Sequence, residues 1–296
     1  MAYVSGRYHL SNLLMDVYAR LGSITFYSAS GGSTTTAINT GTNITDTNLS
    51  GALFVKETTD NAAPEGEFST LSSFAPGTGT FTVGTTLGAS VGSGDIFGYA
   101  TPLYPLQQLI ELANMGLSSI GKLVLVDTTI LTGVSNQSEY AVSVAWKNKV
   151  TRVDIQGITS DSDDNKWIKY DNWEYIPAAA GSTGLIVFNS YIPVGHDLRI
   201  WYTAKHPRVN SYDDFINEAI DPELAIAATV AQAVEWQLSR TQGNNSFLIQ
   251  KLNDARDQFR VALGEFKLRQ KNKIKHFNLG STAYYDNSGP GLVTLA

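Results

Sequence analysis

Apolar residues near the start of the chain recur every three or four positions, which is typical of one buried face of a helix. We expect this helix to run from Tyr8 to Leu21, because Gly22 follows it and glycine commonly ends helices. A second stripe of the same period covers Leu106–Ile120, between Pro105, which suits a first helical position, and Gly121. The first stripe consists of Leu10, Leu13, Leu14, Val17, Tyr18 and Leu21.

Between these helices, residues 22–101 change to short β-type runs separated by Thr, Ser and Gly. Short strands with turn residues between them predict a small barrel or sandwich. Residues 123–205 have the same texture and predict an antiparallel, sandwich-like β region. The strand-like runs are Thr34–Ile38, Ala52–Glu57, Glu67–Leu71, Thr80–Val83 and Asp95–Tyr99, then Tyr140–Val144, Val150–Ile158, Trp167–Tyr170, Leu185–Phe188 and Leu198–Tyr202.

Helical patterning returns in the last third of the chain. The residues 211–214, Ser-Tyr-Asp-Asp, resemble the capping box that starts a helix. A second start lies at Asp221 and Pro222, with Asp as N-cap and Pro at the first helical position. Apolar stripes from Asp221 to Arg240 and from Phe247 to Phe266 predict a long C-terminal helical hairpin.

These patterns together predict an α+β fold. Its centre would be a helical bundle with the long C-terminal hairpin, interrupted by a small β-barrel-like insertion and a second antiparallel β-sandwich-like region. The predicted parts are a helical core of residues 1–21, 102–122 and 206–268, a β insertion domain of residues 22–101, an antiparallel β domain of residues 123–205, and an extended basic C-terminal arm of residues 269–296.

Composition narrows the classes of function. The chain has 296 residues and a net charge of −6, and 16% of its residues are charged, which excludes a polycationic nucleic-acid wrapper and a charge-rich disordered chain. Cysteine is absent, so disulfides, thiolate nucleophiles and Cys-ligated metals are excluded. The amino terminus lacks the pattern of a secretory signal, and no apolar stretch approaches the roughly 20 residues of a membrane helix. We therefore expect a soluble protein made in a cytoplasm.

Charge is distributed unevenly. In residues 22–101 the single basic residue, Lys56, stands against six acidic residues, which gives this segment a net charge of −5. Beyond residue 266 the balance reverses, because five basic residues stand against Asp286 alone, a net charge of +4.

Two nucleotide- or metal-binding patterns are incomplete. Residues 116–123 nearly fit a phosphate-binding loop, but Leu123 replaces the hydroxyl that would hold magnesium. We expect a helix C-terminus there, with Gly121 in the left-handed region. Asp161, Asp163 and Asn165 have the spacing of a calcium loop, but the required glycine and glutamate do not follow, which favours an acidic turn.

Catalytic groups are equally sparse. His9, His196, His206 and His276 match no catalytic motif, although a triad assembled only in three dimensions remains open. Two carboxylates among Glu57, Glu65 and Glu67 would suffice for glycosidic cleavage, but such residues in a β unit are more often solvated. The aromatic residues Trp167, Tyr170, Trp173 and Tyr175 suit either sugar stacking or a core. We expect no catalytic residue, no cofactor and no metal ion, and therefore no enzyme.

The basic C-terminal segment is the candidate partner-binding site. It admits contact with nucleic-acid phosphates, docking on an acidic neighbouring subunit, or a solvated tail. Its residues are Lys267, Arg269, Lys271, Lys273, Lys275, Phe277, Tyr284 and Tyr285.

The layout resembles the head-to-tail connector proteins of tailed bacteriophages, also called adaptor, head-completion or neck proteins. The resemblance rests on the two short helices, the long hairpin and the basic, aromatic-dotted C-terminal segment, and on the β texture of Ala52–Val55, Ala63–Phe68 and Asp127–Trp146. It spans most of the chain and is one of arrangement, without an invariant motif. The two β regions depart from the smaller adaptors.

This resemblance implies a virion structural protein that joins the portal to the tail and lines the DNA passage. It implies a homo-oligomeric, dodecameric ring with the portal protein above, a tail or nozzle protein below, and DNA passing without sequence-specific binding. The basic segment would dock on the portal. The protein would lie in the neck of the virion, which is assembled in the host cytoplasm, and would have no membrane partner. The alternatives are a carbohydrate- or receptor-binding β module of a virion and, third, a glycan hydrolase.

Overall fold

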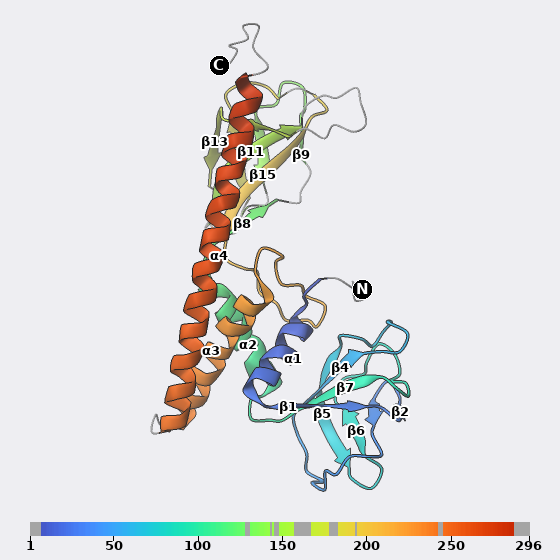
Figure 1. The fold of residues 1–296 in the computed structure, drawn as a ribbon. Coiled ribbons are helices and arrows are strands. Elements are labelled where there is room, and N and C mark those ends of the chain that lie inside the picture. The colour runs from blue at the N-terminus through green and yellow to red at the C-terminus, as the bar shows by residue number, and fades with distance from the viewer. Residues whose placement is uncertain are drawn as a thin grey trace. The chain divides into compact units, whose positions relative to one another are not determined.

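The computed structural model shows two compact units (Figure 1). The first unit comprises residues 1–121 and 206–267, and the second comprises residues 122–205 and 268–296. The first unit is therefore built from segments that are distant in sequence. The structure describes residues 7–127, 131–142, 144, 148–156, 167–177, 183–192, 194–241 and 245–286, with the backbone alone for residues 268–286.

The helices form where the apolar stripes predict them. The buried stripe of α1 ends at Gly22, which has a φ of 71° and donates its N–H to the Ala19 carbonyl at 3.0 Å. At the start of α3, Asp221 accepts the Glu223 N–H at 3.1 Å and Pro222 occupies the first position. The four helices of the described chain are α1 (Leu10–Leu21), α2 (Leu106–Ser119), α3 (Pro222–Arg240) and α4 (Ser246–Asp286).

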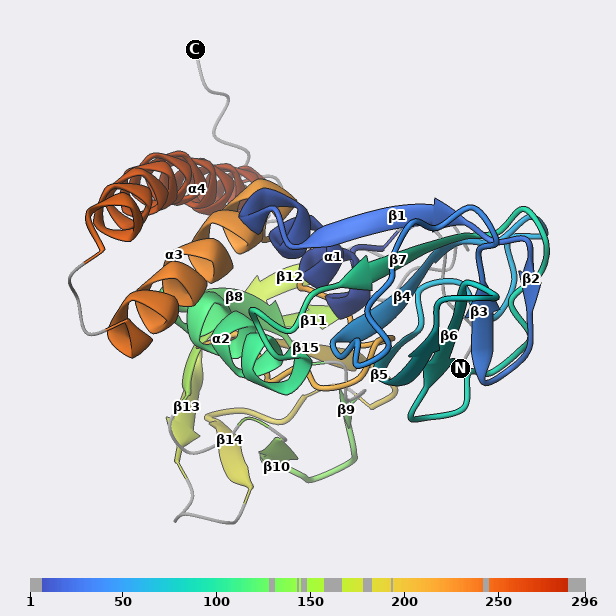
Figure 2. The ribbon, with the colours of Figure 1, turned by 90° about the horizontal axis from the view of Figure 1, so that it is seen from below.

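One antiparallel sheet of the first unit closes on itself. Its strand order is β1-β7-β4-β5-β6-β3-β2, and only Ala29 and Ser30 separate the two outermost strands in sequence (Figure 2). The Ala29 N–H donates to Asp95 and the Ser30 N–H donates to Ile38, both at 2.7 Å, so this one segment continues from the β7 side to the β3 side. The strands are β1 (Ile24–Ser28), β2 (Gly31–Gly32), β3 (Thr36–Ile38), β4 (Ala52–Glu57), β5 (Phe68–Ala75), β6 (Thr80–Val83) and β7 (Ile96–Ala100).

The alternation of side chains along β4 separates two cores. Leu53 and Val55 enter the apolar cluster inside the closed sheet, together with Phe81 and Phe97 of neighbouring strands. Phe54 points to the opposite side, where its ring meets that of Tyr18 of α1 edge-on at 5.6 Å between centroids. Strand β4 therefore holds α1 against the sheet.

The crossing of α2 and α3 depends on the absence of a side chain at Gly116. A Cβ atom at this position would lie 2.9 Å from the Ala228 carbonyl carbon and 2.9 Å from the Thr229 nitrogen, both in the backbone of α3. The two helices thus approach more closely than any other residue at position 116 allows. This contact is the role of the first glycine in the segment that nearly fits a phosphate-binding loop.

The second unit contains two antiparallel sheets. One has the order β12-β11-β15-β8, with β9 also paired to β15, and the other has the order β10-β14-β13. Both contribute to one apolar cluster, for example Val153 and Ile200 from the first and Tyr140 and Ile186 from the second, so the sheets pack together. The strands are β8 (Leu123–Val126), β9 (Leu131–Thr132), β10 (Glu139–Val142), β11 (Lys149–Gln156), β12 (Trp167–Tyr170), β13 (Trp173–Ile176), β14 (Gly184–Phe188) and β15 (Asp197–Ala204).

The predicted fold class, a helical bundle with a long C-terminal hairpin interrupted by β regions, is wrong. By number of elements the described chain is mostly β-sheet, with 15 strands in three antiparallel sheets against four helices. The prediction rested on periodicity, which is strong in long apolar helices and weak in single strands of two to eight residues. The sheets that these strands form nevertheless build two of the cores.

The C-terminal boundary also differs from expectation. Helix α4 has 41 residues against 19 in α3, and it continues past Phe266, where the apolar stripe ends, to Asp286. Residues 269–286 are thus helical rather than extended. Lys, Arg and Gln are good helix formers, so the helix does not need an apolar stripe to continue. The four-part domain division stays a prediction.

Replacement of Gly116 by Ala tests the helix crossing. Because the added methyl group would meet backbone atoms of α3, we expect Gly116→Ala to lower the free energy of unfolding by about 1–3 kcal/mol. The measurement is urea unfolding followed by far-UV circular dichroism. Gly264→Ala is the matched control: that site in α4 has no atom within 4 Å of an added Cβ, so the change should stabilise by up to about 1 kcal/mol. Equal effects at the two glycines would contradict the close crossing.

Candidate functional site

Residues 206–221 connect β15 to α3 and return the chain to the first unit. We call this segment the strap. It contains no helix, and an isolated bridge between Phe215 and His9 is its only strand-like pairing among the described residues. The helix predicted to start at Ser211 is absent, since the first helix after β15 begins at Pro222. Buried backbone outside regular structure needs other hydrogen-bond partners, and the strap finds them on α1 and α2.

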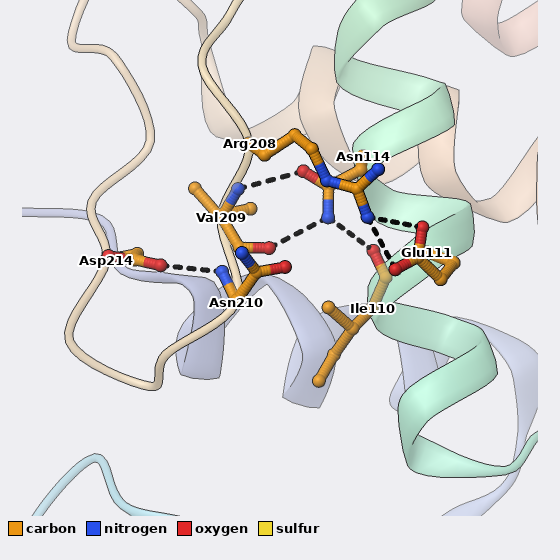
Figure 3. Close-up of polar contacts among 7 residues, drawn as sticks. All are labelled: Ile110, Glu111, Asn114, Arg208, Val209, Asn210 and Asp214. Atoms are coloured by element: carbon orange, nitrogen blue, oxygen red, sulfur yellow. Dashed lines mark hydrogen bonds and ion pairs between the residues drawn. The ribbon is translucent and has the colours of Figure 1, made fainter.

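Asn114 of α2 clamps the strap (Figure 3). Its Oδ1 accepts the Val209 N–H at 2.9 Å, and its Nδ2 donates to the Val209 carbonyl at 2.8 Å. The same Nδ2 also donates to the Ile110 carbonyl of its own helix at 3.0 Å. One amide side chain thereby satisfies both backbone groups of Val209, in the way that a paired strand would.

Two carboxylates complete the clamp. Asp214 bends the strap by accepting the Asn210 N–H at 2.6 Å (Figure 3) and the Ser211 N–H at 2.8 Å. Glu111 receives both of its bonds from Nη2 of Arg208, at 2.5 and 2.6 Å. The Arg208 and Glu111 side chains are 63% and 51% exposed, so this pair contributes little to stability.

Helix α1 holds the other half of the strap through its N-terminal backbone. The Leu10 N–H donates to the Asp214 carbonyl, and the Ile216 N–H donates to the Tyr8 carbonyl, each at 2.8 Å. His9 adds a side-chain bond, because its Nδ1 donates to the Asp213 carbonyl at 3.0 Å. The first of these bonds satisfies one N-terminal N–H of α1, in addition to the capping box that His9 and Asn12 form, and all three attach the strap ahead of α3.

His206 is the first residue of the strap, and it is only 8% exposed. Its Nδ1 donates to the Pro207 carbonyl at 2.6 Å, and its Nε2 accepts the Asn217 N–H at 2.9 Å. Burial lowers the pKa of His206 below its usual value, and the bond to Pro207 partly opposes this shift. The strap therefore contains a neutral imidazole that makes a hydrogen bond at each of its two ring nitrogens.

The predicted partner-binding residues fall at the end of α4. Lys267 is exposed, and the side chains of the others, from Arg269 to Tyr285, lie outside the described atoms. On the helical backbone, Lys267, Lys271 and Lys275 recur every four residues, which places these positions on one face. Their role in binding stays a prediction.

The glutamates considered for glycosidic cleavage have structural bonds. Glu67 is buried and accepts the Gly88 N–H at 2.7 Å, and Glu65 accepts the Thr58 N–H at 3.2 Å. Glu57 is exposed at the end of β4. The structure therefore uses Glu65 and Glu67 to hold loops of the closed sheet.

The aromatic residues considered for sugar binding divide between two sheets. Trp167 and Tyr170 lie on β12, whereas Trp173 and Tyr175 lie on β13. Tyr170, Trp173 and Tyr175 pack against the core of the second unit. The Arg199 guanidinium covers the Trp167 ring at 3.9 Å from its centroid. All four are half-buried, so they do not form one exposed row.

The other candidate patterns add no site. Gly121 has a φ of 110°, as expected of a glycine after a helix. Asp161, Asp163 and Asn165 lie outside the described residues, as does the side chain of His276. Within the described part of the chain, no group of three His, Asp or Glu residues has metal-binding geometry, and no helix is long and apolar enough to cross a membrane.

Sequence reasoning missed Asn114 and the pairing of His206. Asn114 sits among the apolar residues of the α2 stripe, and its buried partner lies 95 positions away. The only sequence signal for this contact was a polar amide within the apolar stripe of a core helix. A polar group buried there needs a hydrogen-bond partner. No protein-family model matches the chain, and a search of curated proteins finds no match.

Removal of the Asn114 amide tests the clamp. We expect Asn114→Ala to lower the free energy of unfolding by about 1–3 kcal/mol, because both polar groups of Val209 lose their partner. Urea unfolding measures the loss. Glu111→Gln, one turn earlier in α2, removes only an exposed ion pair and should change stability by less than about 1 kcal/mol. A larger loss in the Glu111 variant would assign the anchoring to the ion pair instead.

Proposed function

We propose that the protein is a structural subunit of a tailed-phage virion, a connector ring component that joins the portal to the tail. The observation that carries the proposal is the surface of α4 within the first unit. One side of this helix packs in the core, and large apolar side chains on its other side stay uncovered by the residues that the structure describes. Large apolar side chains that stay exposed on one side of a helix are typical of a contact surface, so they favour a partner on this outer side.

The two sides of α4 are distinguished by burial. Leu248, Leu252 and Ala255 are buried. Phe247 and Val261 are 69% and 65% exposed. They are 14 positions apart, which brings them within about 40° of each other around a helix of 3.6 residues per turn. This outer side supports a contact with a second copy of the chain, since each contact in a ring joins two different faces.

The charges of the closed sheet are consistent with a DNA passage. Asp46, Glu57 and Asp60 are exposed on this part of the chain. The one lysine there, Lys56, has its ammonium group over the Phe26 ring at 5.0 Å from the centroid. An acidic wall repels phosphates, so DNA would slide past without being held.

The remaining parts of the proposal follow from the resemblance. The subunit would form a dodecameric ring in the virion neck, with the basic end of α4 docked on the portal protein and a tail or nozzle protein below. Half-buried aromatic residues and glutamates that bond to backbone N–H groups give less support to a carbohydrate-binding module or a glycan hydrolase.

Electron microscopy of the full chain, with and without its portal ring, tests this function. We expect symmetric rings stacked on the portal. The double variant Phe247→Ser and Val261→Ser should lose ring formation at unchanged circular dichroism, because the outer side of α4 becomes polar. Leu103→Ser, at an exposed leucine outside α4, is the matched control and should assemble normally.

Two results would contradict the proposal. Absence of any association, either alone or with the portal, would remove the connector role. Normal rings from the double variant would remove α4 as the contact. Deletion of residues 267–296 then separates the two associations, since it should abolish stacking on the portal and leave self-association intact.

A further inference from the structure

His206 joins two distant points of the strap. Its Nδ1 donates to the carbonyl of Pro207, directly next to it, and its Nε2 accepts the N–H of Asn217. A carbonyl oxygen only accepts, so Nδ1 must carry the proton and Nε2 must be unprotonated. This tautomer closes residues 206–217 into a loop through one buried imidazole.

The two histidines of this region respond differently to a proton. His9 contacts the strap through Nδ1, which donates to the Asp213 carbonyl, and a donor nitrogen keeps its bond when the ring becomes charged. His206 contacts Asn217 through an acceptor nitrogen. Protonation at Nε2 gives both groups a hydrogen and removes the bond. Of the two contacts with the strap, it is therefore the His206 contact with Asn217 that a proton breaks.

The surroundings do not compensate a charge on His206. Within the strap, Asp214 accepts the N–H groups of Asn210 and Ser211, and Asp213 accepts the Ser211 hydroxyl. Next to its ends, Arg208 pairs with Glu111 and Glu218 pairs with Arg7 at 3.3 Å, while Lys205 would oppose a second positive charge. Burial lowers the pKa of His206, and no charged side chain of the described residues contributes to the shift. The closed loop thus favours the neutral ring.

We propose that His206 is an acid-sensitive latch: a proton from solvent binds Nε2, breaks the bond from the Asn217 N–H and releases the strap at Asn217 from His206. The bonds between Asn114 and Val209 and the backbone bonds of α1 involve no imidazole acceptor, so the rest of the strap stays attached to the helices while the Asn217 contact opens. This inference is independent of the proposed role in a virion.

The sign of the pH dependence follows from the two states. The imidazole of the open loop titrates near pH 6.5, and that of the closed loop titrates lower, so the open loop binds more protons between these values. The latch is fully closed above pH 6.5 and weakens as the pH falls. Each pH unit within this window favours opening by up to about tenfold.

Amide hydrogen exchange of the full chain tests the latch. We expect protection at the Asn217 amide, corrected for the intrinsic pH dependence of exchange, to fall by up to about tenfold per pH unit below pH 6.5. Amides of α2 should keep their protection. His206→Gln supplies an acceptor of similar reach that does not titrate, so its Asn217 protection should not change with pH. His196→Gln, in the second unit, should behave as the wild type.

Protection that is independent of pH in the wild type, or that falls equally in His206→Gln, would overturn the proposal. A measurement on the wild type keeps the test valid if the variant does not fold. Nitrogen-15 NMR of labelled histidine should find His206 protonated at Nδ1 and unprotonated at Nε2 at pH 7.5. The opposite tautomer would also overturn it.

Discussion

The close crossing of α2 and α3 at Gly116 is the constraint on which the first unit depends. Helix α2 precedes the inserted residues 122–205, and α3 follows them, so the two halves of this core come from distant parts of the chain. Their backbones meet where any side chain at position 116 would collide with Ala228 or Thr229. Such a crossing tolerates little displacement, because packed interiors do not deform continuously. The strap must therefore deliver α3 to one position.

The strap meets this requirement with hydrogen bonds to backbone rather than with apolar packing alone. Asn114 and His206 each bond to two or more backbone groups, and Asp214 accepts two N–H groups. Removal of such a side chain leaves buried donors and acceptors without partners, which costs more than the loss of an exposed ion pair such as Arg208–Glu111.

Some acidic residues of the segment 22–101 also bond to backbone N–H groups, so its negative charge does not all lie on the surface. Glu67 accepts the Gly88 N–H, and Asp95 accepts the N–H groups of Gly92 and Thr59, so these buried carboxylates belong to the interior of the fold. The exposed acidic groups of residues 22–101 are fewer than the sequence charge indicates. A surface for passing DNA would depend on Asp46, Glu57 and Asp60, and the second unit would present different groups.

The sequence by itself determined the positions of the local elements: the stripe from Leu10 to Leu21, Gly22 as helix end and the Asp221-Pro222 start all act within one or two turns. It did not determine the fold class, since sheet pairing depends on partners far along the chain and short strands carry little periodic signal. Nor did it determine the extent of α4, where helix propensity continues after the apolar stripe ends. The strap was decided only by tertiary structure. A bond between Asn114 and Val209, or between His206 and Asn217, exists only after packing has removed water from both partners.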